Sequence, residues 1–515
     1  MNVQLAKYAQ FVSISAGVAL ISVLFPITAG AEEADLEQRI KQLESALLAT
    51  QQQRIEQDKQ IELLTKELVG IENQLSQSKI AKSEEKSSAK GKPVFASVKD
   101  GLVFSDETGD WSMQLNGRVQ ADYRSINLNE WKNDTFDIRR ARLGGTFTFL
   151  KDFAVRVEAE YANTNDGSKG TTALTYGYLD WKHFAGAKLR VGQFQTVFGL
   201  ERGESTNFTD FQELSLATAT GPSFNSTYDR GVMLFGSPLK GTYYNLSYVN
   251  GSGQNNDAMM NGKDIVGRAA INIADFTNWQ DTVVHIGVSG SQNTVQKSSA
   301  TLAGNDSALS AYTEANGITS NSIKYTNTTA TTFFSTLAFN STHVDKSRVG
   351  LETAIAYGPL KLQGEYINTN FDGRTSAGQE FNKDINAWYA SATWLITGES
   401  YANSYKDAMF GRIIPKHHFS LGEDGYGAFE LGLRYSSFDA SDFKLLGCNT
   451  GSGCLASSSV TNKANAWTGG AKWILNSNAR ILLNYVHTSF DTPIVINSKS
   501  SDKEDTVTMR AQYDF

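Results

Sequence analysis

The last eleven residues of the chain, Asp505–Phe515, alternate strictly between two kinds of side chain. The members of one parity are apolar: Val507, Met509, Ala511, Tyr513 and Phe515. Because successive side chains of a strand point to opposite faces, this segment predicts a strand with one apolar and one polar face. A terminal strand has two edges that need hydrogen-bond partners, and within a membrane only a closed barrel supplies them. We therefore expect the rest of the chain to build the barrel that this strand closes.

The composition of the 515-residue chain fits this expectation. With 40% hydrophobic and 20% charged residues, the chain is too polar for a bundle of membrane helices. Its 44 Gly, 20 Tyr and 28 Phe are typical of many short strands that end in aromatic residues. The net charge of −7 identifies no partner, because the charges are spread over segments that are expected to face different surroundings.

Residues 1–31 have the pattern of a secretory signal peptide. Lys7 gives a positive start, Phe11–Ile27 is apolar, and Ala29-Gly30-Ala31 has the small residues of a cleavage site. The alternative is an uncleaved anchor. The signal peptide predicts that the mature chain begins near Glu32, outside the cytoplasm.

Residues 32–81 predict a periplasmic α-helical coiled coil. Apolar residues recur at alternating steps of four and three, as in a coiled-coil seam: Leu36, Ile40, Leu43, Leu47, Ile61, Leu64, Leu68, Ile71 and Leu75. Thr50, Arg54 and Gln57 make the middle of the seam polar. A lone solvated helix is the alternative. Residues 82–100 are expected to be a linker, and its Lys/Ser/Glu-rich stretch 82–92 to be flexible.

From Trp111 onward the apolar period is two, which predicts an all-β domain over residues 101–515: a 16-stranded antiparallel transmembrane β-barrel. The expected strands are Trp111–Arg124, Phe136–Phe149, Phe153–Ala162, Ala173–Lys182, Ala187–Phe194, Asp229–Gly236, Thr242–Val249, Asp264–Ala274, Thr282–Gly290, Ser347–Tyr357, Pro359–Asn368, Ile385–Ile396, Gly427–Phe438, Ala464–Ile474, Ala479–Thr488 and Asp505–Phe515.

The connections alternate between short turns and long loops, as in barrels with periplasmic turns and external loops. Thr397–Tyr426 breaks the alternation, so either it is a structured periplasmic segment or the strand count is wrong there. The third long loop, Gln195–Tyr228, is expected to fold inward and narrow the channel, although an ordinary surface loop is the alternative. This constriction loop carries four carboxylates and one cation: Glu201, Glu204, Asp210, Glu213 and Arg202.

Many arginines fall on polar faces and should line the lumen. The candidates include Arg118, Arg124, Arg140, Arg142 and Arg190, whereas strict alternation places Arg139 on the lipid face. Fixed guanidinium groups raise the local concentration of anions and offer paired donors to oxyanions. The alternative is that these arginines pair with lumen carboxylates and only line a wet wall.

Other chemistry has little support in the sequence. The six His residues lack metal-ligand spacing, so we expect no metal site, no catalytic residue and no cofactor. His487 and Ser489 lie close on one strand, but no Gly-x-Ser-x-Gly accompanies them. We find no basic nucleic-acid patch. Cys448 and Cys454, on an external loop of an exported chain, predict a disulfide.

Val98 to Phe515 resembles the phosphate-selective porin O and P family. The resemblance rests on several stretches: Asp100-Gly101-Leu102, Asn116–Asp122, Ile138–Arg142, Val191–Phe194, Phe198–Glu201, Asp229-Arg230-Gly231, Leu395–Glu399, Gly425–Glu430 and Arg434-Tyr435-Ser436. It implies a trimeric channel with an inward third loop and anion-contacting residues at Arg118, Arg139, Arg140 and Arg230. The chain departs from the family pattern at Gln212-Glu213, where anion-specific members have a Glu-Arg pair.

These features predict a trimeric diffusion channel of the outer membrane for small hydrophilic solutes, chiefly anions such as phosphate or polyphosphate. A weakly selective or cation-tolerant porin is the alternative that the acidic third loop favours. A third hypothesis makes the protein a structural tether, with Lys41, Lys59 and Lys66 of the coiled coil on peptidoglycan.

Overall fold

A computed structural model describes residues 33–85, 94–97, 101–128, 131–162, 172–219, 228–251, 253–255, 263–296, 317–319, 322–326, 331–336, 343–374, 380–422, 425–444, 455 and 457–515. The expected signal peptide and the Cys448–Cys454 disulfide lie outside the described residues. The chain divides into two units, residues 1–91 and 92–515.

The first unit contains one continuous helix, α2 (Glu33–Glu85). The helix runs four residues past the expected end at residue 81, into the stretch that we predicted to be flexible. Seam residues such as Ile40, Leu47 and Leu64 are 53–62% exposed on this isolated helix. Among the described residues, no helix combines the length and the apolarity needed to cross a membrane.

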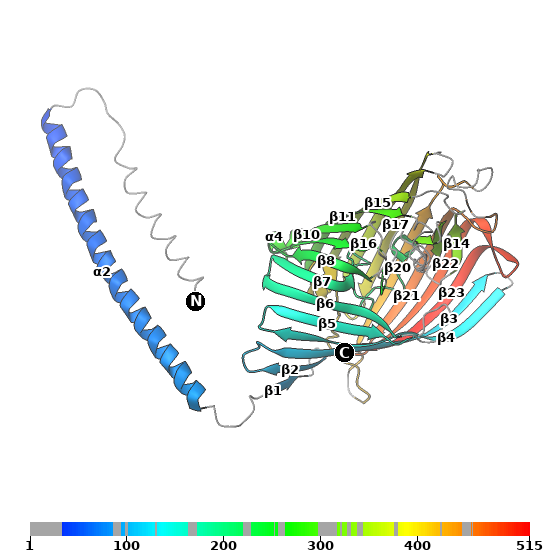
Figure 1. Cartoon of the computed structure of the whole chain (residues 1–515), viewed down its shortest axis with the longest axis horizontal. Coiled ribbons are helices and arrows are strands. Elements are labelled where there is room, and N and C mark those ends of the chain that lie inside the picture. Colours follow the sequence, from blue (N-terminus) through cyan, green and yellow to red (C-terminus); the bar gives the residue numbers. More distant parts are fainter. Residues whose placement is uncertain are drawn as a thin grey trace, which may run out of the picture. The chain divides into compact units, whose positions relative to one another are not determined.

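The second unit is built on one antiparallel sheet of eighteen strands, of which all but β1 and β2 form a closed barrel (Figure 1). The sixteen barrel strands are β3 (Ser112–Leu128), β4 (Trp131–Phe149), β5 (Phe153–Glu160), β6 (Ala173–Phe184), β7 (Ala187–Gln195), β8 (Tyr228–Gly236), β9 (Thr242–Val249), β10 (Asp264–Asn272), β11 (Thr282–Gln296), β15 (His343–Tyr357), β16 (Leu360–Arg374), β17 (Glu380–Leu395), β20 (Ala428–Asp439), β21 (Lys463–Ile474), β22 (Ala479–Ile496) and β23 (Lys499–Asp514). A short helix, α4 (Ile273–Thr277), follows β10.

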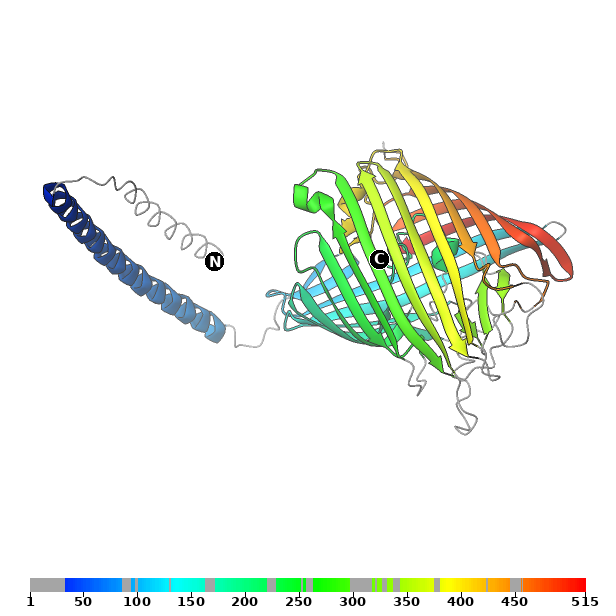
Figure 2. The same ribbon diagram turned by 90° about the horizontal axis from the view of Figure 1, so that it is seen from above.

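The carboxyl-terminal strand closes the barrel as the sequence predicts. Strand β23 pairs with β22 on one edge and with β3 on the other, from Asp505 opposite Asn127 to Asp514 opposite Arg118. All sixteen expected strands are present, and several on the long-loop side run further than their apolar alternation indicated. The strands run obliquely along the barrel wall, as the view of the wall in Figure 2 shows.

The first two strands complete the wall next to the carboxyl terminus. Strand β23 ends at the level of Gly117, whose backbone exchanges two 3.0 Å hydrogen bonds with Phe515. The beginning of β3 would then lack a partner, and β2 (Leu102–Asp106) pairs there, with Leu102 opposite Leu115. Strand β1 (Val94–Ser97) pairs with β2, so part of the expected linker is a strand.

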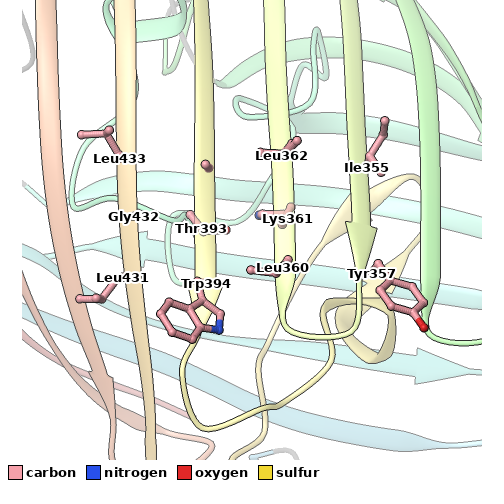
Figure 3. A pocket seen from close by; sticks show the side chains of 11 residues that line it. Ile355, Tyr357, Leu360, Lys361, Leu362, Thr393, Trp394, Leu431, Gly432 and Leu433 are labelled. Atoms are coloured by element: carbon pink, nitrogen blue, oxygen red, sulfur yellow. The ribbon is translucent and has the colours of Figure 1, made fainter.

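The outer face of the barrel is apolar between two zones of aromatic side chains. Towards the long loops, the ring centre of Tyr435 lies 5.3 Å from that of Trp388 and 4.8 Å from that of Trp467. Near the short turns, the ring of Phe429 stacks on that of Trp473 with their centres 5.7 Å apart. Outward-facing Leu, Ile, Tyr and Trp residues of β15, β16, β17 and β20 line a shallow apolar groove near the turn at Gly358 (Figure 3). This groove lies on the membrane-facing wall, so it is separate from the channel.

Part of the long-loop end of the lumen is filled with apolar side chains. A small sheet of β12 (Gly317–Thr319), β13 (Ser322–Thr326) and β14 (Thr332–Ser335) lies within the long connection between β11 and β15. Its Tyr325, Phe333 and Phe334 are fully buried and contact Phe438 at 5.1–5.6 Å. Because the same cluster includes inward residues from β16, β17 and β20–β22, it occupies that side of the lumen.

The segment 396–427, between β17 and β20, is structured, which resolves the alternative that the sequence left open. It contains a 3-10 helix, η2 (Tyr401–Ser404), and a hairpin of β18 (Tyr405–Lys406) and β19 (Met409–Phe410). Tyr401, 1% exposed, donates to Glu430, and the Tyr405 hydroxyl lies 2.7 Å from His285 Nδ1. Since Glu430 and His285 point inward, this segment enters the barrel from the short-turn end.

Candidate functional site: a third loop fastened across an arginine-rich lumen

The described part of the third loop, residues 196–219, lies inside the barrel. It contacts inward-facing residues of strands far apart in the sequence. The hydroxyl oxygen of Ser289 in β11 accepts a hydrogen bond from the Gly199 N–H at 2.9 Å. Lys472 of β21 donates to the Thr209 carbonyl at 3.0 Å. Gln512 of β23 donates to the Asn207 carbonyl at 3.1 Å. The loop therefore spans the lumen, as the sequence predicted.

The entrance of the loop is held by two buried carboxylates. Glu365 of β16 accepts from the backbone N–H groups of Leu200 and Glu201 at 2.9 and 2.6 Å. Glu201 in turn pairs with Arg434 of β20 at 2.7 Å and accepts from the Ser215 N–H before the short helix α3 (Leu216–Ala219). A carboxylate that is saturated by such donors is a structural anchor with little charge left for a passing ion.

The other loop carboxylates also have cationic partners. Asp210 pairs with Lys361 of β16 at 2.7 Å. Glu213 lies 2.8 Å from Arg510, 3.2 Å from Arg139 and 3.4 Å from Arg124. Burial opposes ionisation of Glu213, but these arginines outweigh it and hold the pKa of its carboxyl well below the usual range. The charged carboxylate of Glu213 therefore links arginines of three strands, β3, β4 and β23, to the loop.

Glu204 is the exception among the loop carboxylates. Its side chain is buried, and burial raises the pKa of the carboxyl well above its usual range, with Asp210 and Glu201 adding to the effect against the opposing Lys361. Burial therefore favours the uncharged form of the Glu204 carboxyl. The acidic composition of the loop thus does not by itself produce an acidic constriction, because three of its carboxylates are paired and the uncharged form of the fourth is favoured.

A β-bulge corrects the expected position of Arg139. The pairing of β3 with β4 shifts between Gln120 and Ala121, so Gln120 faces Arg140, Ala121 faces Ile138, and Arg139 has no opposite residue. A bulge adds one residue to a strand and re-aims its side chain. Arg139 consequently reaches Glu213 inside the barrel, and the prediction that it faces lipid is wrong.

Arg118 of β3 and Arg140 of β4 have close partners that are mostly neutral. The Arg118 Nη1 atom donates to Thr206 Oγ1 and Asn207 Oδ1, both at 2.7 Å, and Glu158 is 4.0 Å away. Arg140 donates to Gln120 Oε1 at 2.8 Å. Among the residues that the structure describes, no carboxylate oxygen lies within 4 Å of the Arg140 guanidinium. Gln120 also donates to the Thr206 carbonyl, so both arginines adjoin one stretch of the loop.

The remaining predicted arginines are matched by carboxylates or lie apart. Arg124 pairs with Asp122 at 3.0 Å, Arg142 with Glu160 at 2.6 Å, and Arg190 with Asp180 through two bonds of 2.7 and 2.9 Å. Arg142, Arg156 and Arg190 also lie over tyrosine rings, at 5.5, 4.2 and 3.8 Å from Tyr228, Tyr176 and Tyr178. These pairs make much of this wall electrically balanced.

Arg230 and Arg202 lie outside the cluster around Glu213. Arg230 donates to Gln193 at 3.2 Å and shares its parity with Val232 and Leu234, which are exposed on the outer face. Arg202 is buried and donates to the Thr218 carbonyl at 3.2 Å, which holds two parts of the loop together. The structure thus brings together Arg118, Arg124, Arg139, Arg140 and Arg142, but not these two.

The sequence did not indicate two contributors to the site. Lys361, 2% exposed, follows the polar parity of β16 and could have been found from it. Arg412 belongs to the segment 396–427, which has no periodicity, and it reaches the third loop at Phe208, 4.9 Å from the ring centre. Only the three-dimensional path of that segment reveals this contact.

Comparisons with known proteins identify the family to which the chain belongs. Porin O of Pseudomonas aeruginosa is 25% identical over 449 residues, covering 82% of this chain and 93% of that protein. The anion-selective porin of Comamonas acidovorans superposes with a TM-score of 0.48 and 13% identity over 79% of this chain and all of that one. The channel DcaP of Acinetobacter baumannii gives 0.45 and 13% over 81% of this chain and all of that one. The family model of phosphate-selective porin O and P matches residues 113–515, and the chain belongs to this family.

Proposed function

We propose that the protein is an anion-preferring diffusion channel whose selective contact is the pair Arg118 and Arg140 beside the third loop. As a member of its family, the protein is a porin of the outer membrane and not an enzyme. The short-turn end then faces the periplasm, and the long loops face outward. Solutes pass along their gradient, and no cofactor or covalent step takes part.

The observation that carries the proposal is the uneven pairing of the lumen cations. Most arginines of the wall have a carboxylate oxygen at 2.6–3.2 Å, whereas Arg140 faces an amide oxygen and Arg118 faces a hydroxyl, an amide and a carboxylate at the longer distance of 4.0 Å. A small oxyanion can replace these neutral acceptors and gain charge-assisted hydrogen bonds from both guanidinium groups. Inorganic phosphate and polyphosphate carry the required geometry and charge.

The cation-tolerant alternative loses its main support. It rested on the carboxylates of the third loop. Three of these are bound to Arg434, Lys361 and Arg510, and burial favours the uncharged form of Glu204. A paired carboxylate presents a weak field to a passing ion, because its cation lies within 3 Å and solvent screens the remainder.

We also propose a homotrimer with α2 as a periplasmic coiled coil. The support is the exposed seam of α2, because Ile40, Leu43, Leu47, Ile61 and Leu64 would all be buried between copies. The tether hypothesis requires lysines on the outer face of the rod, but Lys66 is already paired with Glu62 at 2.8 Å. The seam therefore favours self-association over attachment to the cell wall.

The test is the zero-current potential of the purified channel in a planar bilayer under a KCl gradient, repeated with added phosphate. Wild type should prefer chloride and be blocked by phosphate. Arg118→Ala and Arg140→Ala should each raise the blocking constant about tenfold, since one charge-assisted hydrogen bond is worth ~1.5–3 kcal/mol.

The matched control removes a balanced pair from the same lumen. The double variant Arg190→Ala with Asp180→Asn leaves the net charge unchanged, because these two side chains neutralise each other. Phosphate should block this double variant with the same blocking constant as wild type. Cation preference in wild type, or equal phosphate block in all variants, would contradict the proposal.

A further inference from the structure

Three segments meet around one aromatic side chain of the third loop, at the short-turn end of the lumen. Phe208 lies next to two guanidinium groups, with its ring centre 4.9 Å from the central carbon of Arg412 and 5.1 Å from that of Arg480. Arg480 belongs to β22, and Arg412 belongs to the segment 396–427. A guanidinium over an aromatic face is attracted by the ring quadrupole, and more so where water is scarce.

One carboxylate holds both of these arginines. Asp514, the penultimate residue of the chain, is 1% exposed. Its Oδ2 atom lies 2.6 Å from Arg412 Nη2, and its Oδ1 atom lies 2.9 Å from Arg480 Nη2. Gln512 also donates to Oδ1 at 3.0 Å, and Arg412 additionally donates to the Ser477 carbonyl. Asp514 thereby fixes the planes of both guanidinium groups.

The same network continues to the proposed anion contact. Arg480 Nη1 donates to the Asn207 carbonyl at 2.9 Å, and Gln512 donates to the same oxygen at 3.1 Å. The side-chain oxygen of Asn207 accepts from Arg118 at 2.7 Å. Asp514 stands opposite Arg118 in the pairing of β23 with β3, and it is also connected to Arg118 through two side chains, Arg480 and Asn207, and through the aromatic contact of Phe208.

We propose that Asp514 is a positioning residue for anion recognition: from the carboxyl-terminal strand it sets, through Arg412, Arg480 and the Asn207-Phe208 stretch, where Arg118 stands in the lumen. The inference rests on the proposed function of Arg118. It assigns to the end of β23 a role beyond closing the wall, and it makes the segment 396–427 part of the selective site.

The geometry explains why a carboxylate is needed at this position. Two cations converge on Phe208, and without Asp514 they would repel each other and lose their shared partner. Asparagine has the same shape but keeps only one acceptor oxygen and no charge. In Asp514→Asn we expect one arginine to turn away, which would release the Asn207 carbonyl and the Arg118 side chain from their present places.

The experiment compares Asp514→Asn with Asp505→Asn in bilayers. Asp505 lies on the same strand and pairs with His487 at 2.7 Å and Tyr485 at 2.6 Å, on the outer face and away from the third loop. Asp514→Asn should raise the phosphate blocking constant about tenfold and increase current noise in the open state, while Asp505→Asn stays within twofold of wild type.

A second pair of variants covers the case in which Asp514→Asn does not assemble. Phe208→Leu removes the ring next to the arginines and should raise the blocking constant in the same direction, whereas Phe208→Tyr keeps the ring and should restore wild-type block. A merely structural strut would lower the melting temperature in both Phe208 variants without this split. Equal block by Phe208→Leu, Phe208→Tyr and wild type would overturn the proposal.

The outcomes separate this inference from the proposed function. If Arg118→Ala weakens the block and the Asp514 and Phe208 variants do not, the anion contact stands and the positioning role is wrong. If Arg118→Ala itself leaves the block unchanged, the proposed function fails first. In that case a rise in open-channel noise in Asp514→Asn alone would show that Asp514 holds the loop but not an anion site, which overturns the inference as stated.

Discussion

At the scale of single residues, the selectivity of the lumen depends on which charges lack a counter-charge. The polar parity of the strands indicated where Arg118, Arg140, Arg142 and Arg190 would point, because alternation alone fixes the face of a strand residue. It could not indicate that Arg190 is neutralised by Asp180 while Arg140 meets Gln120, since these partners depend on the register between strands. The candidate site was thus predictable in its residues and not in its balance of charge.

A comparison of two loop carboxylates tests this charge balance. Glu213→Gln leaves Arg124, Arg139 and Arg510 without their shared anion, so the zero-current potential should shift further towards chloride. Glu204→Gln should change the potential less, because burial favours the uncharged form of that carboxyl. The measurement is the bilayer potential under a KCl gradient. A shift of similar size in both variants would show that Glu204 is charged.

The pH dependence of selectivity follows from the lowered pKa of Glu213. Its folded pKa lies well below the value of about 4.3 for an unfolded Glu, so its contacts contribute fully above that pH and are lost only as pH falls through the lower folded value. The potential should therefore stay constant as pH falls from 8 through the usual range of Glu pKa values. Wild type should approach Glu213→Gln only at a pH well below that range, and a change of wild type towards Glu213→Gln within the usual range would contradict the lowered pKa.

At the scale of elements, regular patterns were predictable and interruptions of them were not. All sixteen barrel strands follow from apolar alternation. The bulge at Arg139, in contrast, adds one residue between two stretches of β4 that each alternate regularly. Likewise, the segment 396–427 carries no period, so its entry into the barrel depends on contacts such as Tyr401 with Glu430. Bulges and inward segments are set by tertiary partners, which no local pattern contains.

Deleting Arg139 tests whether the bulge is a true insertion. Removing this one residue leaves Ile138 outward and Arg140 inward, in unbroken alternation, so the barrel should still assemble with a melting temperature close to that of wild type. The lumen would lose one partner of Glu213, as in Arg139→Ala, and both variants should shift the zero-current potential equally. As a control, deleting Ile138 should abolish assembly, because it pushes an arginine to the lipid face.

At the scale of the whole molecule, the barrel closes without help from the helical unit. Strand β23 pairs with β3 over ten residue pairs, and β2 completes the start of β3, so every barrel strand has two neighbours within residues 92–515. The helix α2 contributes only its exposed seam, whose polar centre at Thr50, Arg54 and Gln57 is suited to fix the register of identical copies. Conductance and assembly should therefore be separable functions of the two units.

Deletion of residues 35–80 tests this separation. The shortened protein should keep the single-channel conductance, the chloride preference and the phosphate block of wild type, because Arg118, Arg140 and the third loop are all held by barrel residues. Its oligomer should dissociate at a lower temperature in gel assays, since apolar seam residues at five or more positions lose their burial between copies. Replacing Arg54 with Leu in the full chain should act in the opposite direction and raise that temperature, because an apolar layer replaces a charged one. If the deletion abolished phosphate block while leaving conductance intact, selectivity would depend on the helical unit, and the assignment of recognition to the barrel would have to be abandoned.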